Sequence, residues 1–569
     1  MARSRRPRID GRRKARYRNA EVDFLKPILP DFDIKEWEKK PWPERLKMAC
    51  QDWVIQGYGT PMPVYLFYVL KVGFYIWMWT WFCSFTPGMG SLRAIGEWWY
   101  APIAFQKAVL WSMAFEVAGL GCASGPLAGR YNPPFGGIFY FLRPGTIKMP
   151  FFKGAPFIGG SKRTWLEALL FAALMVSLVR ALIAPELGFS LLLPIAILVP
   201  VIGVLDTTVF LTARSEHYYS ALICFLFAAD WIAGTKWVWA AIWFWAATSK
   251  LTRHFPSVIA VMQSTSPMTQ YLPFLRKAMF RDFPDDLHPS RLATVMAHVG
   301  TVVELALPMV LIASDGGTST TVALAVMLAF HLFITTSVPL GVPIEWNFMM
   351  VYGGFVLFGH YADVSAFSIG SPVLITYLIC AVFLLQLAGN LFPSKISFLL
   401  SMRYYAGNWA YSVWLFKGNS IEKMDTHIKK PARTTRAQLR EVYDEDTVTG
   451  VLSKVPVFRA MHIQGRILHS LIPKAVDDID AYEYADGEAI AGLILGWNMG
   501  DGHLHQQRLL EAVQNECRYE EGELRCIFVE AQPIQRPYLA WTIADAKTGV
   551  IESGETNVKE LLALQPWPG

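Results

Sequence analysis

The sequence has little charge. Charged residues make up only 17% of its 569 residues, against about 25% in an average soluble protein. Hydrophobic residues make up 53% and aromatic residues 14%. This balance excludes a disordered or collagen-like chain and argues against an ordinary water-soluble enzyme. It indicates a protein that crosses a membrane several times.

Cysteine is also scarce, and the common catalytic motifs are missing. The seven cysteines form no CxxC pair, and four of them lie in or near apolar segments. A disulfide scaffold is therefore excluded, and these cysteines are expected to act as small hydrophobic residues. The sequence has no Walker loop, dinucleotide fingerprint, G-x-S-x-G or H-E-x-x-H motif.

Long apolar segments dominate the first 392 residues. A bilayer core needs about 20 apolar residues per helix. About ten segments qualify, with eight as a lower bound: 64–85, 104–121, 165–184, 189–212, 218–229, 237–249, 293–313, 320–338, 343–360 and 372–392. The fifth and sixth are short and are compatible with a single hairpin.

The placement of charge predicts the topology. Basic residues gather in segments 123–164 and 250–292 and after residue 393, whereas the intervening loops hold mainly acids. Because cytoplasmic loops carry the excess of Lys and Arg, we expect both termini in the cytoplasm and the spans in the inner membrane of a bacterial cell.

Nine of the first 18 residues are Arg or Lys. Such an arm can bind nucleic acid or be disordered, but in a membrane protein it more often contacts anionic lipid headgroups. Membrane lipids are therefore the expected partners, with no nucleic acid.

The chain divides into three predicted parts. Residues 1–63 form the basic arm and an amphipathic stretch, which is either an interfacial helix or a helix packed on the C-terminal part. Residues 64–392 form the membrane domain. Residues 393–569 are more polar and read as a small cytoplasmic α+β domain, with a helix after 505 and strands near 523–533 and on either side of a turn at 545–549. The expected fold is thus an all-α polytopic membrane protein with a small C-terminal α+β domain.

Ionisable residues inside apolar segments are costly and are candidates for function. They are Glu116, Arg180, Asp206, His217, Asp230, Lys250, His298, Glu304, His331 and Glu345. Lys250 ends a Trp-rich helix, where an apolar wall would favour its neutral form and let it act as a base. The competing interpretation is a boundary lysine anchored in headgroups. A mid-span His331 needs a hydrogen-bond partner, and Glu304 is the nearest candidate in the sequence.

Two stretches carry a resemblance. Residues 165–362 resemble the membrane domain of vitamin K-dependent γ-carboxylase and of its bacterial relatives, the HTTM-domain proteins. The resemblance lies in ARSEHYYSALICFLFAAD followed by AATSKLTRHFPS, and in the later stretch LAFHLFITTSVPLGVPIEWNF. The resemblance implies that His217 and Lys250 serve a deprotonation with a quinone-type, lipid-soluble cofactor. Apart from the resemblance, the ionisable residues Glu216, Glu304, His331 and Asp206 are the expected polar groups of the pocket, and Glu216 stands where the carboxylase usually has Asn.

The tail resembles a different group. The stretches GWNMGDGHLH, FVEAQP and QPWP are similar to a family of bacterial transmembrane proteins of unknown function, which implies no activity. Asp501, His503 and His505 form a D-x-H-x-H string, but no third ligand is fixed by spacing, so we expect no metal site.

Three hypotheses follow. The first is an intramembrane enzyme that acts on a lipid-soluble substrate or quinone with Lys250 as base. The second is a non-enzymatic carrier or transporter of a lipid or pigment. The third is an accessory subunit that contacts other membrane proteins through its C-terminal domain.

Overall fold

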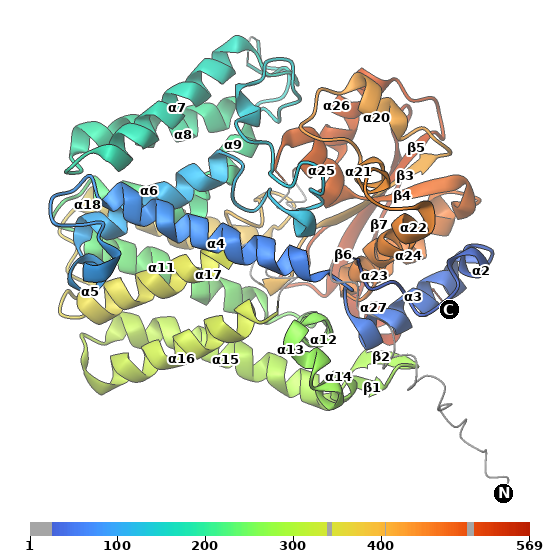
Figure 1. Ribbon diagram of the computed structural model, residues 1–569, viewed down its shortest axis with the longest axis horizontal. Helices are drawn as coiled ribbons and strands as arrows, with labels where there is room; N and C mark the ends of the chain where they lie inside the picture. The colour runs from blue at the N-terminus through green and yellow to red at the C-terminus, as the bar shows by residue number, and fades with distance from the viewer. Residues whose placement is uncertain are drawn as a thin grey trace, which may run out of the picture.

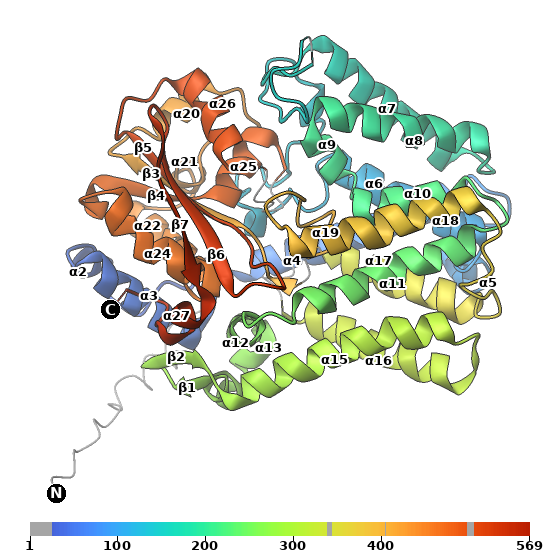
Figure 2. The same ribbon diagram turned by 180° about the vertical axis from the view of Figure 1, so that it is seen from behind.

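The computed structural model describes residues 26–568 except 157, 338–343, 404–405, 498–503 and 505. A helical bundle occupies one half of the molecule and an α+β region the other (Figure 1). The long helices of the bundle run roughly side by side, with their ends facing the α+β region (Figures 1 and 2).

Among the described residues, five helices are long and apolar enough to cross a membrane: α4 (Met62–Cys83), α7 (Trp165–Ile183), α15 (Arg291–Ala313), α16 (Gly317–Thr335) and the continuous segment Pro372–Leu391. The last one is built from α18 (Pro372–Leu378), the π-helical η6 (Ile379–Leu384) and α19 (Leu385–Leu391). No more than 39% of the most apolar window of any of them is buried within the protein. Their remaining apolar surface is available to lipid.

The other expected spans form shorter or more buried helices. They are α6 (Pro102–Val117), α8 (Phe189–Leu205), α10 (Ser220–Phe225), α11 (Trp231–Ser249) and α17 (Ile344–Gly354), which continues into η5 (Phe355–His360). Side chains around nearly the whole circumference of α6 and α11 are buried. These two helices form the core of the bundle, because their apolar residues face other helices on all sides.

Short elements connect the bundle helices. They are η1 (Leu92–Ala94), α5 (Ile95–Trp98), η2 (Pro126–Ala128), η3 (Tyr140–Leu142), α9 (Thr207–Thr212), η4 (Ser215–Tyr219), α12 (Phe255–Thr265), α13 (Pro267–Gln270), α14 (Pro273–Ala278), β1 (Phe280–Asp282) and β2 (Asp286–Pro289). The helix η4 is a single π-helical turn. The last two strands pair as a small antiparallel ribbon.

The C-terminal region contains an antiparallel five-stranded sheet of order β4-β3-β5-β6-β7. Its strands are β3 (Tyr411–Lys417), β4 (Tyr482–Asp486), β5 (Leu524–Val529), β6 (Tyr538–Asp545) and β7 (Gly549–Asn557). The predicted strands match β5, β6 and β7, and the predicted helix matches α26 (Gln507–Cys517).

Helices cover both faces of this sheet. Alternate residues of β3 point to opposite faces: Val413 and Leu415 pack with α24 (Ile463–Ala475) and α27 (Val558–Ala563), whereas Trp414 and Phe416 pack with α25 (Gly487–Leu495) and α26. The remaining helices are α20 (Glu422–His427), α21 (Thr435–Arg440), α22 (Glu445–Leu452), α23 (Lys454–Ala460) and the short η8 (Ile479–Ala481).

The amphipathic N-terminal stretch packs on protein. It forms α2 (Ile34–Glu38) and α3 (Trp42–Gln56). Leu46, Trp53 and Val54 of α3 are buried in one cluster with residues of α12 and α23. Of the two interpretations of this stretch, the structure therefore favours a helix docked on the C-terminal region. The basic arm lies outside the described residues.

The segment between α6 and α7 joins the two halves of the molecule. The guanidinium of Arg130 donates to the carbonyl of Gly492 at 2.6 Å. The Tyr140 hydroxyl lies 2.8 Å from the carbonyl oxygen of Ile494 and 2.9 Å from that of Lys429, and its single O–H donates to one of them at a time. Arg130 and Tyr140 are almost fully buried. This Gly- and Pro-rich segment thus fixes the position of the α+β region against the bundle.

Candidate functional site

Lys250 lies at the C-terminal end of α11 and is only 6% exposed. Its ammonium donates to the carboxylate of Glu304 on α15. The rings of Phe255 and Phe330 lie 4.8 Å and 5.7 Å from the amine. The structure therefore brings together two of the predicted site residues as a buried ion pair with aromatic walls.

His331 has partners other than Glu304, so the predicted contact between these two residues was wrong. Its Nε2 accepts a hydrogen bond from the indole of Trp243 at 3.0 Å, and its Nδ1 lies 2.9 Å from the Oδ1 of Asn347. An imidazole that accepts at Nε2 must carry its proton on Nδ1 to donate to the amide oxygen. His331 is therefore a neutral, fully bonded link between α11, α16 and α17.

Asp206 and Glu216 also form buried ion pairs. Asp206 caps α9 and binds the guanidinium of Arg163, and neither side chain is more than 1% exposed. Glu216 pairs with Arg214 at the start of η4. Both pairs neutralise charge inside the bundle and are compatible with a structural role.

His217 lies apart from Lys250. Its ring packs against Trp239, with centroids 4.2 Å apart. Trp239 precedes Lys250 by eleven residues on α11, which corresponds to about 16 Å of helix. No contact joins the two groups, so the structure does not gather the predicted amine and imidazole in one chamber.

The residues of the D-x-H-x-H string cannot be placed. Asp501, His503 and His505 lie outside the described residues. Within the described part of the chain, no group of three or more His, Cys, Asp or Glu side chains could hold a metal ion.

A cavity of about 450 Å³ lies at the junction between the bundle and the C-terminal region. One wall comes from the start of α4 and from segment 122–131. The opposite wall comes from α21, α22, α23, β4 and α25. Pro, Leu, Val, Ile, Phe, Ala, Trp and Cys together supply most of the lining residues, so the cavity is mainly apolar.

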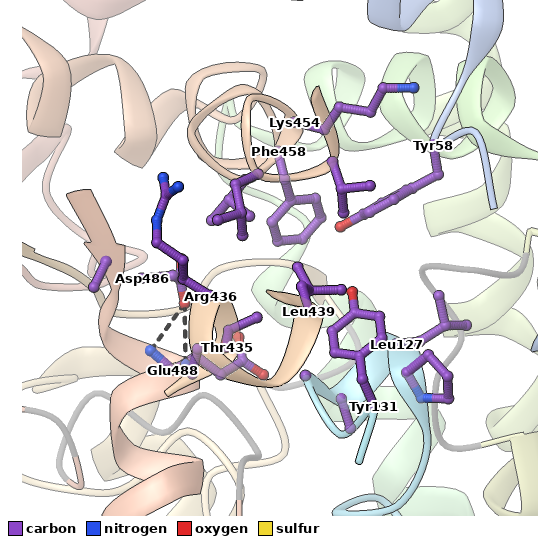
Figure 3. A pocket seen from close by; sticks show the side chains of 18 of the residues that line it. Tyr58, Leu127, Tyr131, Thr435, Arg436, Leu439, Lys454, Phe458, Asp486 and Glu488 are labelled. Carbon is purple, nitrogen blue, oxygen red and sulfur yellow. Dashed lines mark hydrogen bonds between the residues drawn. The ribbon is translucent and has the colours of Figure 1, made fainter. Parts of the chain in front are cut away.

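Two tyrosines supply polar groups at its centre. Figure 3 shows the hydroxyls of Tyr58 and Tyr131 pointing toward one another into the cavity. Neither hydroxyl has a hydrogen-bond partner among the described residues. Burial raises the pKa of Tyr131 to about 12 and also raises the pKa of Tyr58. Both phenols therefore stay protonated at neutral pH and are available to donate hydrogen bonds to a ligand.

The charges around the cavity are balanced. Three basic residues line it, namely Arg436, Lys454 and Arg459, together with three acidic residues, namely Glu483, Asp486 and Glu488.

Most of these charges form ion pairs. Arg459 binds Asp486 and Glu488, with 2.7 Å and 2.8 Å between its Nη2 and one oxygen of each carboxylate. Arg436 lies 3.3 Å from Glu483. The lining therefore carries no net charge to attract an ionic ligand.

Sequence reasoning missed this cavity. Tyr131 follows Tyr58 by more than 70 residues, and Arg459 follows Tyr131 by more than 300. None of the three belongs to a local motif. The only signal was the long Gly- and Pro-rich segment after α6, which contains Tyr131.

Residues 22–569 match the model of DUF3556, which is described as a transmembrane protein of unknown function. The chain belongs to this family. It is a membrane protein with several apolar helices, and the family assigns it no activity. No curated protein and no solved structure matches the chain.

Proposed function

We propose that the protein binds an uncharged, amphipathic, lipid-like molecule in the cavity between the bundle and the C-terminal region. This proposal corresponds to the second hypothesis, a non-enzymatic carrier, and involves no chemical reaction of the ligand. The observation that carries it is the pair of unpartnered tyrosine hydroxyls in a mainly apolar cavity.

The size and lining of the cavity support this class of ligand. Small-molecule sites typically measure about 300–1,000 Å³ and combine apolar walls with a few convergent polar groups. The cavity of about 450 Å³ lies within this range. It adjoins the first residues of α4, a candidate membrane helix, so a molecule dissolved in the bilayer would have a short way to reach it.

The polar groups favour a neutral head group. Two protonated phenols offer donors to a carbonyl or hydroxyl oxygen. An anionic head group would need excess positive charge, but the three lining cations face three lining acids. A quinone-type molecule or a neutral glycerolipid has the required combination of apolar body and oxygen acceptors.

Calorimetry in detergent tests the proposal. The probes are decyl-ubiquinone and dioctanoylglycerol, which are uncharged, and dioctanoyl phosphatidic acid, which is anionic. We expect the uncharged probes to bind more tightly. Tyr131→Phe should weaken their binding about fivefold, since a typical hydrogen bond contributes about 1 kcal/mol.

A filling variant gives a second test. Leu127→Trp places a larger side chain in the wall of the cavity and should abolish binding. The matched control is Leu66→Trp on the exposed face of α4, where Leu66 is 51% exposed. Preference for the anionic probe, or unchanged binding by Leu127→Trp, would contradict the proposal.

The buried pair of Lys250 and Glu304 supports a second candidate, an intramembrane enzyme with Lys250 as base. Transfer of a proton from the ammonium to the carboxylate would leave a neutral amine beside two aromatic rings. Lys250→Ala should then lose all turnover of a lipid-soluble substrate, measured at a temperature where the variant, although less stable, is still folded. Full activity in this variant would exclude the role.

The loop charges support a topology with eight to ten spans in the inner membrane and both termini in the cytoplasm. The C-terminal region would then face the cytoplasm, where it could contact other membrane-protein subunits. Reporter fusions at residue 1 and residue 569 test this arrangement. An external signal from either end would contradict it.

A further inference from the structure

An outward-facing apolar surface lies on α13, α14 and the turn that joins them. Met268, Tyr271, Leu272 and Phe274 are all exposed there, Tyr271 by 83% and Phe274 by 68%. Both helices are too short to cross a bilayer. They lie at the end of the bundle that faces the C-terminal region (Figure 1). We call residues 267–278 the surface segment.

The underside of the surface segment is polar and firmly held on protein. The buried guanidinium of Arg276 donates to the Thr269 hydroxyl at 3.0 Å and to the carbonyl of Ile55 in α3 at 2.9 Å. The hydroxyl of Ser266, just before the segment, donates to the carbonyl of Thr336 at 2.7 Å. These bonds fix which face of the segment points outward.

This arrangement of polarity is the reverse of that expected at a surface in water. Arginine is almost never fully buried in soluble proteins unless it is paired, and large apolar side chains seldom gather on the outside. Here Arg276 points inward, whereas Tyr271 and Phe274 point outward. Exposed apolar patches mark contacts with a membrane or with another protein. The surface segment is therefore built to contact a partner.

A candidate membrane helix lies beside the surface segment. The short helix α12 packs on both α14 and α15, and Leu275, Ala293 and Ala297 belong to one apolar cluster with it. The exposed apolar face of α15 begins at Leu292. About 32 Å of helix follow from Leu292 to the end of α15, close to the hydrocarbon thickness of about 30 Å. The start of α15 and the surface segment thus lie near one boundary of the bilayer core.

Basic side chains accompany the aromatic ones at this boundary. Lys277 in α14 and Arg291 at the start of α15 are both exposed. Phe274 and Lys277 are three residues apart in α14, so they lie on the same side of the helix. Aromatic rings next to cations are typical of segments in the headgroup layer, where the cation attracts anionic lipid. This combination favours a lipid surface over the apolar face of a second protein.

We propose that the surface segment is an interfacial anchor. It inserts Tyr271 and Phe274 among the lipid headgroups and places Lys277 against an anionic phospholipid. The anchor also holds the C-terminal region close to the membrane, because Arg276 ties it to α3 and Trp53 of α3 packs in the cluster that includes α23. This inference is independent of the proposed ligand cavity.

Fluorescence quenching in lipid nanodiscs tests the inference. The full-length protein carries Cys380→Ser, which removes an exposed thiol, and Tyr271→Cys, which is labelled with an environment-sensitive fluorophore. The nanodiscs contain phosphatidylcholine and phosphatidylglycerol, with a nitroxide quencher either on the headgroup or in the middle of the acyl chain. Iodide quenches from the water. We expect the headgroup nitroxide to quench this label most strongly.

Two labelled positions serve as matched controls. Val302→Cys in the middle of α15 should respond most to the mid-chain nitroxide. Val550→Cys on β7 of the C-terminal region should respond most to iodide and emit at a longer wavelength than the label at Tyr271→Cys. Both replaced side chains are exposed, as Tyr271 is, so the changes leave the core intact. A label at Phe274→Cys should repeat the result of Tyr271→Cys.

Spin-labelled lipids test the role of Lys277. Quenching of the Tyr271→Cys label by spin-labelled phosphatidylglycerol, relative to spin-labelled phosphatidylcholine, measures which lipid gathers at the anchor. Lys277→Gln should lower this ratio by up to about fivefold, the effect of one basic side chain at an anionic surface. Lys417→Gln, at the exposed end of β3, should leave the ratio unchanged.

Each quencher identifies one way in which the inference would fail. Strongest quenching of the Tyr271→Cys label by iodide would place the surface segment in water. Strongest quenching by the mid-chain nitroxide would place it inside the hydrocarbon core. Protection from all three quenchers would show that protein, such as a second copy of the chain, covers it. An unchanged lipid ratio in Lys277→Gln would overturn the contact with an anionic headgroup.

Discussion

The buried arginine beside the cavity gives a sharp test of how the C-terminal region is held together. Arg459 on α23 is 3% exposed and binds Asp486 and Glu488 through three hydrogen bonds. Arg459→Met removes the positive charge but keeps the apolar part of the side chain. Asp486 and Glu488 then lose the positive charge that Arg459 supplies.

The expected cost is about 3–5 kcal/mol, the usual result of removing one partner of a buried pair. For a cooperative unit of the size of the C-terminal region, this corresponds to a decrease in Tm of roughly 6–20 °C. Thermal unfolding in detergent, followed by intrinsic fluorescence, measures it. The control is Arg536→Met, which removes an arginine paired with Glu555 at 2.7 Å but about half exposed. That change should cost less than about 1 kcal/mol.

The pH dependence adds an independent check. Burial already raises the pKa of Glu488, and loss of Arg459 would raise it further because Arg459 opposes that shift. A carboxyl group with a raised pKa binds more protons in the folded state than in the unfolded state, so it gains stability as the pH falls. The difference in unfolding free energy between the unchanged protein and Arg459→Met should therefore become smaller as the pH falls from about 7 to about 5. The reasoning would be refuted if Arg459→Met lowered the Tm no more than Arg536→Met does. It would also be refuted if the stability difference between Arg459→Met and the unchanged protein grew as the pH falls.

Three further predictions concern other buried positions. Burial lowers the pKa of Lys454 to about 8, whereas a lysine in an unfolded chain has a pKa of about 10.4. Between these values the unfolded state binds the proton and the folded state does not, so the free energy of unfolding should rise by up to about 3 kcal/mol from pH 8 to pH 10. Lys454→Met should lack this rise. A Cβ added at Gly465 in α24 would lie 1.6 Å from a carbonyl oxygen of α23, so Gly465→Ala should lower the Tm strongly, whereas Gly300→Ala in α15, with open space around it, should leave it unchanged or higher. Glu304→Gln should cost about 3–5 kcal/mol in thermal unfolding because it leaves Lys250 buried without its partner, and a loss below 1 kcal/mol would contradict this.

Apolar runs predicted the positions of the long helices well. The expected segments 165–184 and 293–313 match α7 and α15 to within two residues. The runs do not distinguish a helix that faces lipid from one buried among other helices, because both are apolar throughout. Thus α6 was predicted as a span like any other, and the segment of α11 as a short span or one half of a hairpin, whereas both helices form the core of the bundle.

Partners were harder to predict than positions. The sequence identified Lys250, Glu304 and His331 as buried polar residues, but it paired the wrong two. Which helix faces meet depends on the packing of the whole bundle, and the spacing of residues within one helix does not reveal it.

The strands β3 and β4 were missed for a related reason. They are separated by 64 residues that contain several helices, so no hairpin signal marks them.

The segment between α6 and α7 has a practical consequence for dissecting the protein. Arg130 and Tyr140 place their polar atoms on carbonyls of Lys429, Gly492 and Ile494. Cutting the chain near residue 393 would strip those acceptors from two side chains now shielded from water. Each fragment would then expose unpaired polar groups at the broken interface, so the bundle and the C-terminal region are best produced together in one chain.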